Sequence, residues 1–294
     1  MNHGPLVFLA AFVALSASWC GLVMAPQIQI GGELQQTNTV NTAQRYPENR
    51  PGVARQGAEI YRQEGCFYCH SQQVRQTGIA ANVVLNEMGT NPVAVANAVL
   101  KANPQGERIA PAALAFNLPR TVLSGLEIHD ANAAVKALQA AGAKSSAVLV
   151  PEGPDISRAW GKRRTVAADY LYDATVMLGS QRVGPDLADV GVRLPDLNWQ
   201  LVHLYAPRAE VKDSIMPRYT FLFEVRRQGS RPSPEALQIP AGEFTPPRGY
   251  EVVPTPGATQ LAAYLVSLRS DAPLFEAPFT PPPPPPAPTN APAK

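Results

Sequence analysis

The residues with the clearest chemical potential are Cys66, Cys69 and His70, which form the motif C-x-x-C-H. Two thiols at this spacing can each form a thioether to one vinyl group of a haem, and the adjacent imidazole can then bind the iron as proximal ligand. A structural zinc site needs four ligands, yet the remaining cysteine, Cys20, lies in an apolar run. A redox dithiol is typical of a βαβ context, which this segment lacks. The motif therefore predicts one covalently attached haem c.

Three later residues are candidate partners of that haem. Pro185 lies in the turn GPDL, where a proline carbonyl can accept a hydrogen bond from the ring of the haem histidine. Met216, followed by a proline, is the candidate sixth ligand, and His203 competes for that position. Taken alone, GPDL indicates only a turn, and an isolated methionine is more often core filler. The order of these segments along the chain favours the ligand roles.

A basic cluster surrounds Trp160. It is either a solvated face or a surface complementary to haem propionates or to an acidic partner. The cluster consists of Arg158, Lys162, Arg163 and Arg164.

Two predicted helices are expected to position the haem motif. One is expected to begin near Val53, with Gly57, Ile60 and Tyr61 on one face, just before the haem motif. The other covers residues 259–268 and places leucines and a tyrosine at helical spacing. A glycine in one helix and aromatic residues in the other allow a close crossing, as in small cytochromes c. The alternative is two unrelated amphipathic helices.

The first apolar run, residues 5–26, precedes any charged side chain. About 22 helical residues span roughly 33 Å, which is enough to cross a bilayer. A cleaved signal peptide fits less well, because no Lys or Arg precedes the run. We therefore expect a single-pass anchor in a bacterial inner (cytoplasmic) membrane. Covalent haem attachment in bacteria is periplasmic, so the haem domain is expected on that side.

Residues 82–152 read as strand, helix, helix, strand, helix and strand. This order, with the phrase KALQAAGAKSSAVLV, resembles the C-terminal domain of the bacterial ribosomal stalk protein. The segment has no clustered His, Cys or paired carboxylates, and His129 is expected at a helix start or on the surface. We interpret it as an inserted module that docks an unknown protein partner and has no catalytic role.

Composition and length complete the domain prediction. A net charge of +2 argues against nucleic acid as the main partner, and many of the 31 prolines lie in the C-terminal tail. We expect a mainly α chain in which a cytochrome c domain is interrupted by a small α/β (α+β) module. Its parts are an anchor (1–32), a linker (33–52), a first cytochrome c part (53–81), the inserted module (82–152), a second cytochrome c part (153–271) and a proline-rich tail (272–294).

Three stretches together resemble a known family. GAEIYRQEGCFYCHSQQVR (57–75), RTVAADYLYDATVMLGSQRVGPDLADVGVR (164–193) and HLYAPRAEVKDSIMPRYTFL (203–222) resemble the membrane-anchored monohaem subunit II, fixO-like, of cbb3-type cytochrome c oxidases. The inserted module and the proline-rich tail depart from that pattern.

The resemblance implies thioethers at Cys66 and Cys69, a proximal His70 and a distal Met216. It also implies electron transfer from a donor cytochrome to the catalytic haem-copper subunit, beside other cytochrome c subunits. Such a chain has no oxygen-reducing site of its own. The alternatives are a monohaem subunit of another membrane respiratory complex, a haem-based sensor with an open sixth site, and a docking protein in which the haem is structural.

Overall fold

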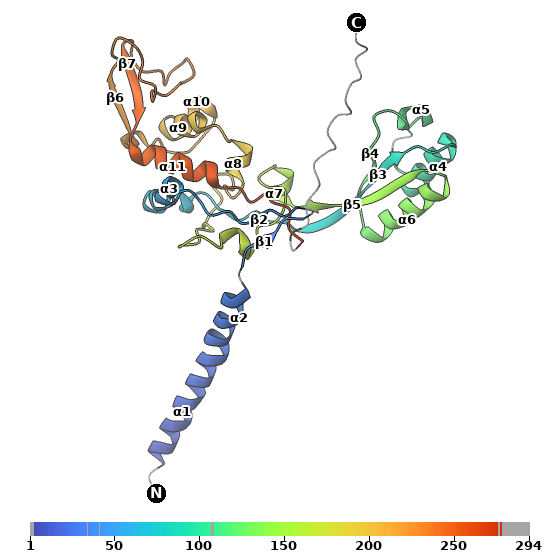
Figure 1. Cartoon of the computed structure of the whole chain (residues 1–294), viewed down its shortest axis with the longest axis horizontal. Helices are drawn as coiled ribbons and strands as arrows, with labels where there is room; N and C mark the ends of the chain where they lie inside the picture. The colour runs from blue at the N-terminus through green and yellow to red at the C-terminus, as the bar shows by residue number, and fades with distance from the viewer. Residues whose placement is uncertain (1–2, 34, 41, 107–108, 276, 278–294) are drawn as a thin grey trace. The chain divides into compact units, whose positions relative to one another are not determined.

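The chain divides into two units, which are described separately. One consists of residues 1–49 with residues 166–176, and the other of residues 50–165 with residues 177–294. The computed structural model describes residues 3–33, 35–40, 42–106, 109–275 and 277, and Figure 1 labels their elements.

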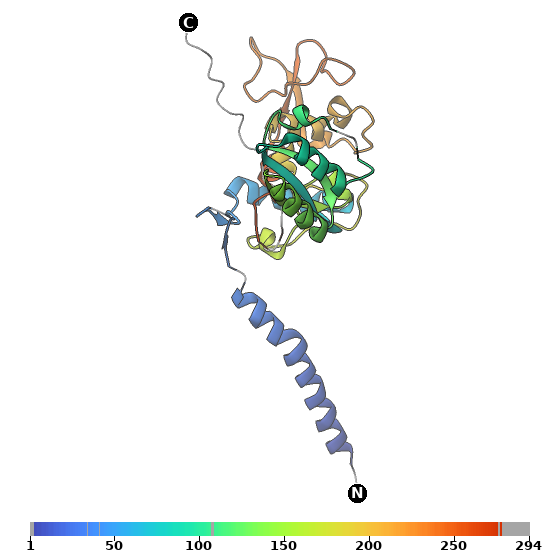
Figure 2. The same cartoon turned by 90° about the vertical axis from the view of Figure 1, so that its right-hand side faces the viewer.

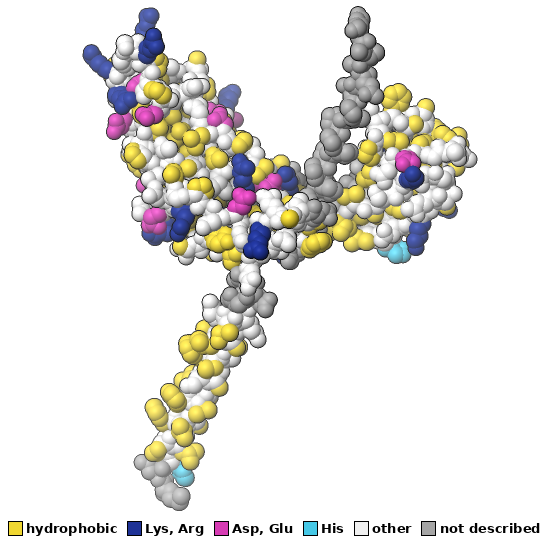
Figure 3. Space-filling model, viewed as in Figure 1, with side chains coloured by type: hydrophobic (Ala, Val, Ile, Leu, Met, Phe, Trp, Pro, Cys, Tyr) yellow, Lys and Arg dark blue, Asp and Glu magenta, His cyan; other side chains and the backbone are white. Residues whose placement is uncertain are grey.

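A long apolar helix begins the first unit. Helix α1 (Gly4–Trp19) continues through a π-helical turn (Cys20–Met24) into α2 (Ala25–Glu33). The stretch Gly4–Gln29 has 26 residues, and an 18-residue window within it has a mean hydropathy of 2.2. It includes the predicted anchor, and Figure 3 shows hydrophobic side chains along the visible face of the helix. By length and composition it is the one helix in the described part of the chain that can cross a membrane.

The expected linker contains a short hairpin. Strand β1 (Thr37–Asn38) pairs antiparallel with β2 (Arg45–Tyr46). The buried Tyr46 hydroxyl donates a 2.8 Å hydrogen bond to Asp169, which lies in a 3₁₀ turn (Ala167–Tyr170). Residues 166–176 belong to the same unit as residues 1–49.

In the second unit, α3 (Gly52–Gln63) packs against the C-terminal helix α11 (Pro256–Ser267). Thr255 caps α11 by accepting a hydrogen bond from the Ala258 amide, and proline occupies the first turn. At the crossing, a Cβ on Gly57 would lie 1.9 Å from the Gln260 carbonyl oxygen. This is the close crossing predicted from the two helical patterns.

Shorter helices complete this layer around one hydrophobic core. They are α8 (Val190–Arg193), α9 (Leu197–Tyr205), α10 (Pro207–Glu210) and a 3₁₀ turn (Thr220–Leu222). The Asp196 side chain caps α9 by accepting from the Asn198 amide. Helix α9 packs on α11, and both contribute leucines to the core.

A β-hairpin that the sequence analysis did not predict lies before α11. Strand β6 (Phe223–Arg227) pairs with β7 (Tyr250–Pro254), and Phe223 and Val252 enter the core. With 41% helix and 16% strand, the chain is a mixed structure. The expectation of a mainly α chain therefore underestimated the strands, because it omitted β6–β7 and β1–β2.

The inserted module has its own core. Its elements follow the predicted order of types, and its sheet has the strand order β4-β3-β5 with antiparallel pairing. Helices α4 and α6 lie on one face of the sheet (Figure 1 and Figure 2). Ala81, Val83 and Leu85 share the hydrophobic core with residues of both helices. The elements are β3 (Gly78–Glu87), α4 (Pro92–Ala102), α5 (Pro111–Leu114), β4 (Arg120–Leu126), α6 (Ile128–Ala140) and β5 (Lys144–Glu152).

The first and last strands of the module, β3 and β5, pair with each other. The β3–β5 register runs from Glu87↔Lys144 to Gly78↔Glu152, so pairing already begins before residue 82. Helix α7 (Pro154–Ser157) follows directly. His129 is exposed in the first turn of α6, as the sequence indicates.

At the C-terminal end, the Ser270 amide donates to the Ala188 carbonyl, and Leu274 is buried. The run of prolines in the predicted tail lies outside the described residues.

Candidate cofactor-binding site

The C-x-x-C-H motif lies in a tight turn directly after α3. Gly65 has a left-handed φ of 68°, and a 3₁₀ turn (Cys66–Tyr68) follows it. The His70 amide then donates to the Cys66 carbonyl at 3.0 Å. Cys66 is buried and Cys69 is exposed, and neither forms a disulfide in the described part of the chain. Burial is the main cause that raises the pKa of Cys66 to about 12.

The His70 ring is held by the GPDL turn. Its Nδ1 lies 2.8 Å from the Pro185 carbonyl oxygen, which is the hydrogen bond that the sequence pattern predicted. Since a carbonyl only accepts, Nδ1 carries the proton and Nε2 keeps its lone pair. Burial lowers the pKa of His70, although the bond to Pro185 opposes this, so the ring favours the neutral form that binds metals.

Gly184 leaves space for the imidazole ring of His70. A Cβ at this position would lie 2.2 Å from Cε1 of His70. The Gly184 amide also donates to the Cys69 carbonyl at 2.9 Å, which ties the turn to the motif. A side chain at position 184 would collide with the His70 ring, which accounts for the glycine at the start of GPDL.

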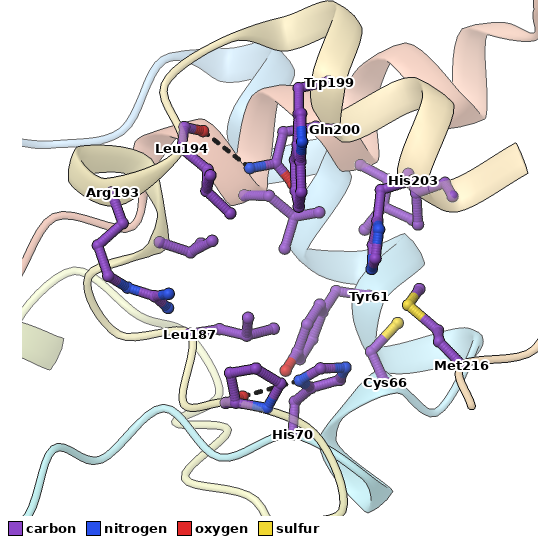
Figure 4. Close-up of a pocket in the computed structure, with 15 residues that line it drawn as sticks. Tyr61, Cys66, His70, Leu187, Arg193, Leu194, Trp199, Gln200, His203 and Met216 are labelled. Carbon is purple, nitrogen blue, oxygen red and sulfur yellow. Dashed lines mark hydrogen bonds between the residues drawn. The ribbon is translucent and has the colours of Figure 1, made fainter. Parts of the chain in front are cut away.

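His70 faces a cavity whose lining is mostly apolar. Figure 4 shows its ring on one side of this space and His203 on the other, with Cys66 and Met216 along one flank. Most of the remaining lining is aliphatic and comes from the turn after Pro185 and from α8, α9 and α11. These residues are Leu187, Val190, Leu194, Leu204, Leu261 and Leu265.

Both candidates for the distal position line this cavity. His203, on α9, stacks on Trp199 with ring centroids 4.8 Å apart, and its buried Nδ1 has no hydrogen-bond partner among the described residues. Burial and the proximity of His70 lower the pKa of His203 to about 4, so its ring is neutral near pH 7. Met216 lies on the loop after α10. The geometry brings both side chains to the site without assigning the sixth ligand.

Arg193 is a lining residue that the sequence analysis did not single out. Its Nη2 donates to the Asp186 carbonyl at 2.5 Å, and its buried Nε has no partner in the described part of the chain. Burial lowers the pKa of Arg193, while Asp189 and Asp186 oppose this change. Figure 4 places the guanidinium at the edge of the cavity, where it suits a carboxylate of a bound group.

These features fit one haem. The cavity offers an apolar lining, a neutral imidazole with a lone pair, a thioether, the Cys66 thiol and a buried cation. The second thiol of the motif, Cys69, lines the adjoining hollow that shares Cys66, His70 and Met216. The basic cluster around Trp160 is not part of this lining, and Arg163 is fully buried, where it donates to the Ala272 carbonyl. The four basic residues therefore do not form one exposed face.

Residues 152–239 match the family model for the mono-haem subunit of cytochrome c oxidase, FixO. The matched stretch includes Pro185, Arg193, His203 and Met216, and it lies after the C-x-x-C-H motif. The match confirms the resemblance to fixO-like subunits of cbb3-type oxidases, and this family implies a haem cofactor. A comparison with curated proteins found no match.

Proposed function

We propose that this chain is an electron-transfer subunit of a cbb3-type oxidase, with one covalent haem c. It passes electrons from a donor cytochrome to the catalytic haem-copper subunit. The observation that carries this proposal is the convergence of the C-x-x-C-H motif, the Pro185-bound imidazole and Met216 on one apolar cavity. The FixO match over residues 152–239 supports it.

The haem supplies a one-electron Fe(III)/Fe(II) couple when it is bound. Cys66 and Cys69 would hold it covalently, and Nε2 of His70 would bind the iron. The Pro185 carbonyl orients that ring and strengthens it as a ligand. Met216 would supply a second protein ligand to the iron, and the Arg193 guanidinium would pair with a haem carboxylate. The aliphatic lining keeps water away from the redox centre.

The test of haem attachment uses the three cysteines. Cys66→Ala and Cys69→Ala should each leave at most one thioether, and the double variant should carry no covalent haem. Cys20→Ala is the matched control, because Cys20 lies in the apolar N-terminal helix. Haem stain on a denaturing gel provides the measurement. A stained band from the double variant would contradict the proposal.

We further propose that the apolar helix spans the bacterial inner membrane once, with the haem domain in the periplasm. Its length and composition support the span. Protease added to intact spheroplasts should then release a soluble haem fragment. Release that occurs only after lysis would place the domain on the cytoplasmic side.

The partners follow from the same function. We expect the chain to purify from membranes with a copper-containing, multi-span subunit and other cytochrome c subunits. Purification with a quinol-oxidising or nitric-oxide-reducing complex would instead assign it to another respiratory complex. We propose that the inserted module, whose core is its own, docks a further protein.

A further inference from the structure

Asp186, the residue after Pro185, fixes the GPDL turn to the segment that follows His70. Its carboxylate is fully buried. Oδ2 accepts hydrogen bonds from the Ser71 hydroxyl at 2.6 Å and from the Gln73 amide at 2.7 Å. The carbonyl that orients the imidazole is therefore held by a charged neighbour.

Arg182 links Asp186 to Asp155, which lies farther from the haem site. Its Nη1 donates to Oδ2 of Asp155 at 2.5 Å. Its Nη2 donates to the Gln73 carbonyl and lies 3.7 Å from Oδ2 of Asp186. One guanidinium thus joins two carboxylates and the backbone next to the proximal histidine.

Asp155 joins Arg182 to the base of the inserted module. It is fully buried in α7, three residues after β5 ends, and its Oδ2 also accepts from the Arg75 amide at 2.7 Å. Arg75 lies three residues before β3 begins. Burial raises the pKa of Asp155, but hydrogen bonds from Arg75 and Arg182 outweigh burial, so its pKa lies below the usual value and the group is ionised.

We propose that Arg182 and Asp155 are positioning residues that set the hydrogen bond between His70 and Pro185, and through it the reduction potential of the haem. The inference rests on the proposed function. It also means that the two ends of the module are connected to the ligand of the iron by hydrogen bonds and ion pairs.

Charge and positioning make opposite predictions for Arg182. Loss of a cation near the iron favours Fe(III), so charge alone predicts that Arg182→Gln lowers the potential. A loosened turn weakens the bond from Nδ1 to Pro185, which makes the imidazole a weaker donor to Fe(III). Positioning therefore predicts that Arg182→Gln raises the potential.

The experiment compares midpoint potentials of haem-loaded full-length variants, after covalent haem content has been checked. Arg182→Gln and Asp155→Asn should both raise the potential. The double variant removes a neutral pair, so charge alone predicts a wild-type value, whereas positioning predicts a rise between those of the two single variants. Arg62→Gln is the matched control, because it removes the same charge from an exposed ion pair with Glu59 on α3.

Arg182→Lys keeps the inference testable if Arg182→Gln fails to load haem. It retains the charge but cannot make all the contacts of the guanidinium, so the potential should still rise. A fall in Arg182→Gln, a wild-type potential in Arg182→Lys or a double variant equal to wild type would each overturn the inference. Wild-type protein without covalent haem would instead overturn the proposed function, so the two failures are distinguishable.

Discussion

At the scale of single residues, two side chains that line the cavity are candidates for the distal ligand of the proposed haem. We expect Met216→Ala to open the sixth position to water or carbon monoxide. It should also lower the reduction potential, because a thioether favours Fe(II) more than water does. Carbon monoxide binding and redox titration provide the measurements.

His203→Ala is the matched comparison, since it removes a residue that lines the same cavity. It should leave the sixth ligand in place and change the potential less. If His203→Ala opens the site and Met216→Ala does not, the ligand assignment is wrong.

Asp189, at the start of α8, is a buried carboxylate whose charge the fold disfavours. Burial, followed by repulsion from Asp271, raises its pKa from 3.8 to about 7, although Lys162, Arg193 and Arg163 oppose the change. The folded chain therefore retains a proton that the unfolded chain has already lost. The stability that the proton on Asp189 contributes is complete below about pH 4 and is lost as the pH rises through about 7.

Asp189→Asn should remove that pH dependence. The free energy of unfolding of the variant minus that of wild type should be larger at pH 8 than at pH 5, by on the order of 1 to 3 kcal/mol. Denaturant unfolding at the two pH values measures the change. Asp130→Asn, at an exposed position of the inserted module, is the control and should track wild type. If the free energy of unfolding changed equally with pH in Asp189→Asn and in wild type, this account of the Asp189 carboxyl would be wrong.

What could be predicted at this scale was local in sequence. The motif Cys66 to His70 and the turn at Pro185 have recognisable spacing, and the bond between His70 and Pro185 follows from it. Arg193 had no such signal. The pairing of Asp155 with Arg182 joins residues 27 positions apart that have no common motif, so only the fold shows it.

At the scale of elements, the crossing of α3 and α11 depends on Gly57. Gly57→Ala should force the helices apart, because the added Cβ would meet backbone atoms of Gln260. We expect a loss of about 1 to 3 kcal/mol in the free energy of unfolding. Gly52→Ala, in the same helix, meets nothing within 4 Å and is the control. Equal thermal midpoints for the two variants would argue against a tight crossing.

The elements that periodicity could predict were those with long regular patterns. The faces of α3 and α11 and five of the six elements of the inserted module belong to this group, whereas α5 has only four residues. The β6–β7 hairpin escaped prediction because a stretch rich in proline and glycine, residues 228–249, separates two strands of five residues each. Their pairing depends on contacts across that stretch rather than on a local signal.

At the scale of the whole molecule, we expect the module to be removable, because it has a hydrophobic core of its own. Gly78 and Glu152 are direct register partners, so residues 79–151 can be replaced by the two-residue turn Asn-Gly. The variant should retain covalent haem and the contacts of Asp155, and its midpoint potential should stay near that of wild type. Haem staining and redox titration measure this. Loss of haem would show that the cytochrome fold requires the module.

The paired ends of the module also affect how the cytochrome fold can close. Gln56 on α3 and Gln260 on α11 are hydrogen-bonded across 204 positions of the chain. Thr77 and Glu152, which are 75 positions apart, are joined once the module has folded on its own, so the effective separation falls to about 130 positions. The entropy of closing that loop then costs about 0.4 kcal/mol less. A module that folds early therefore shortens the path by which the two terminal helices of the cytochrome fold find each other.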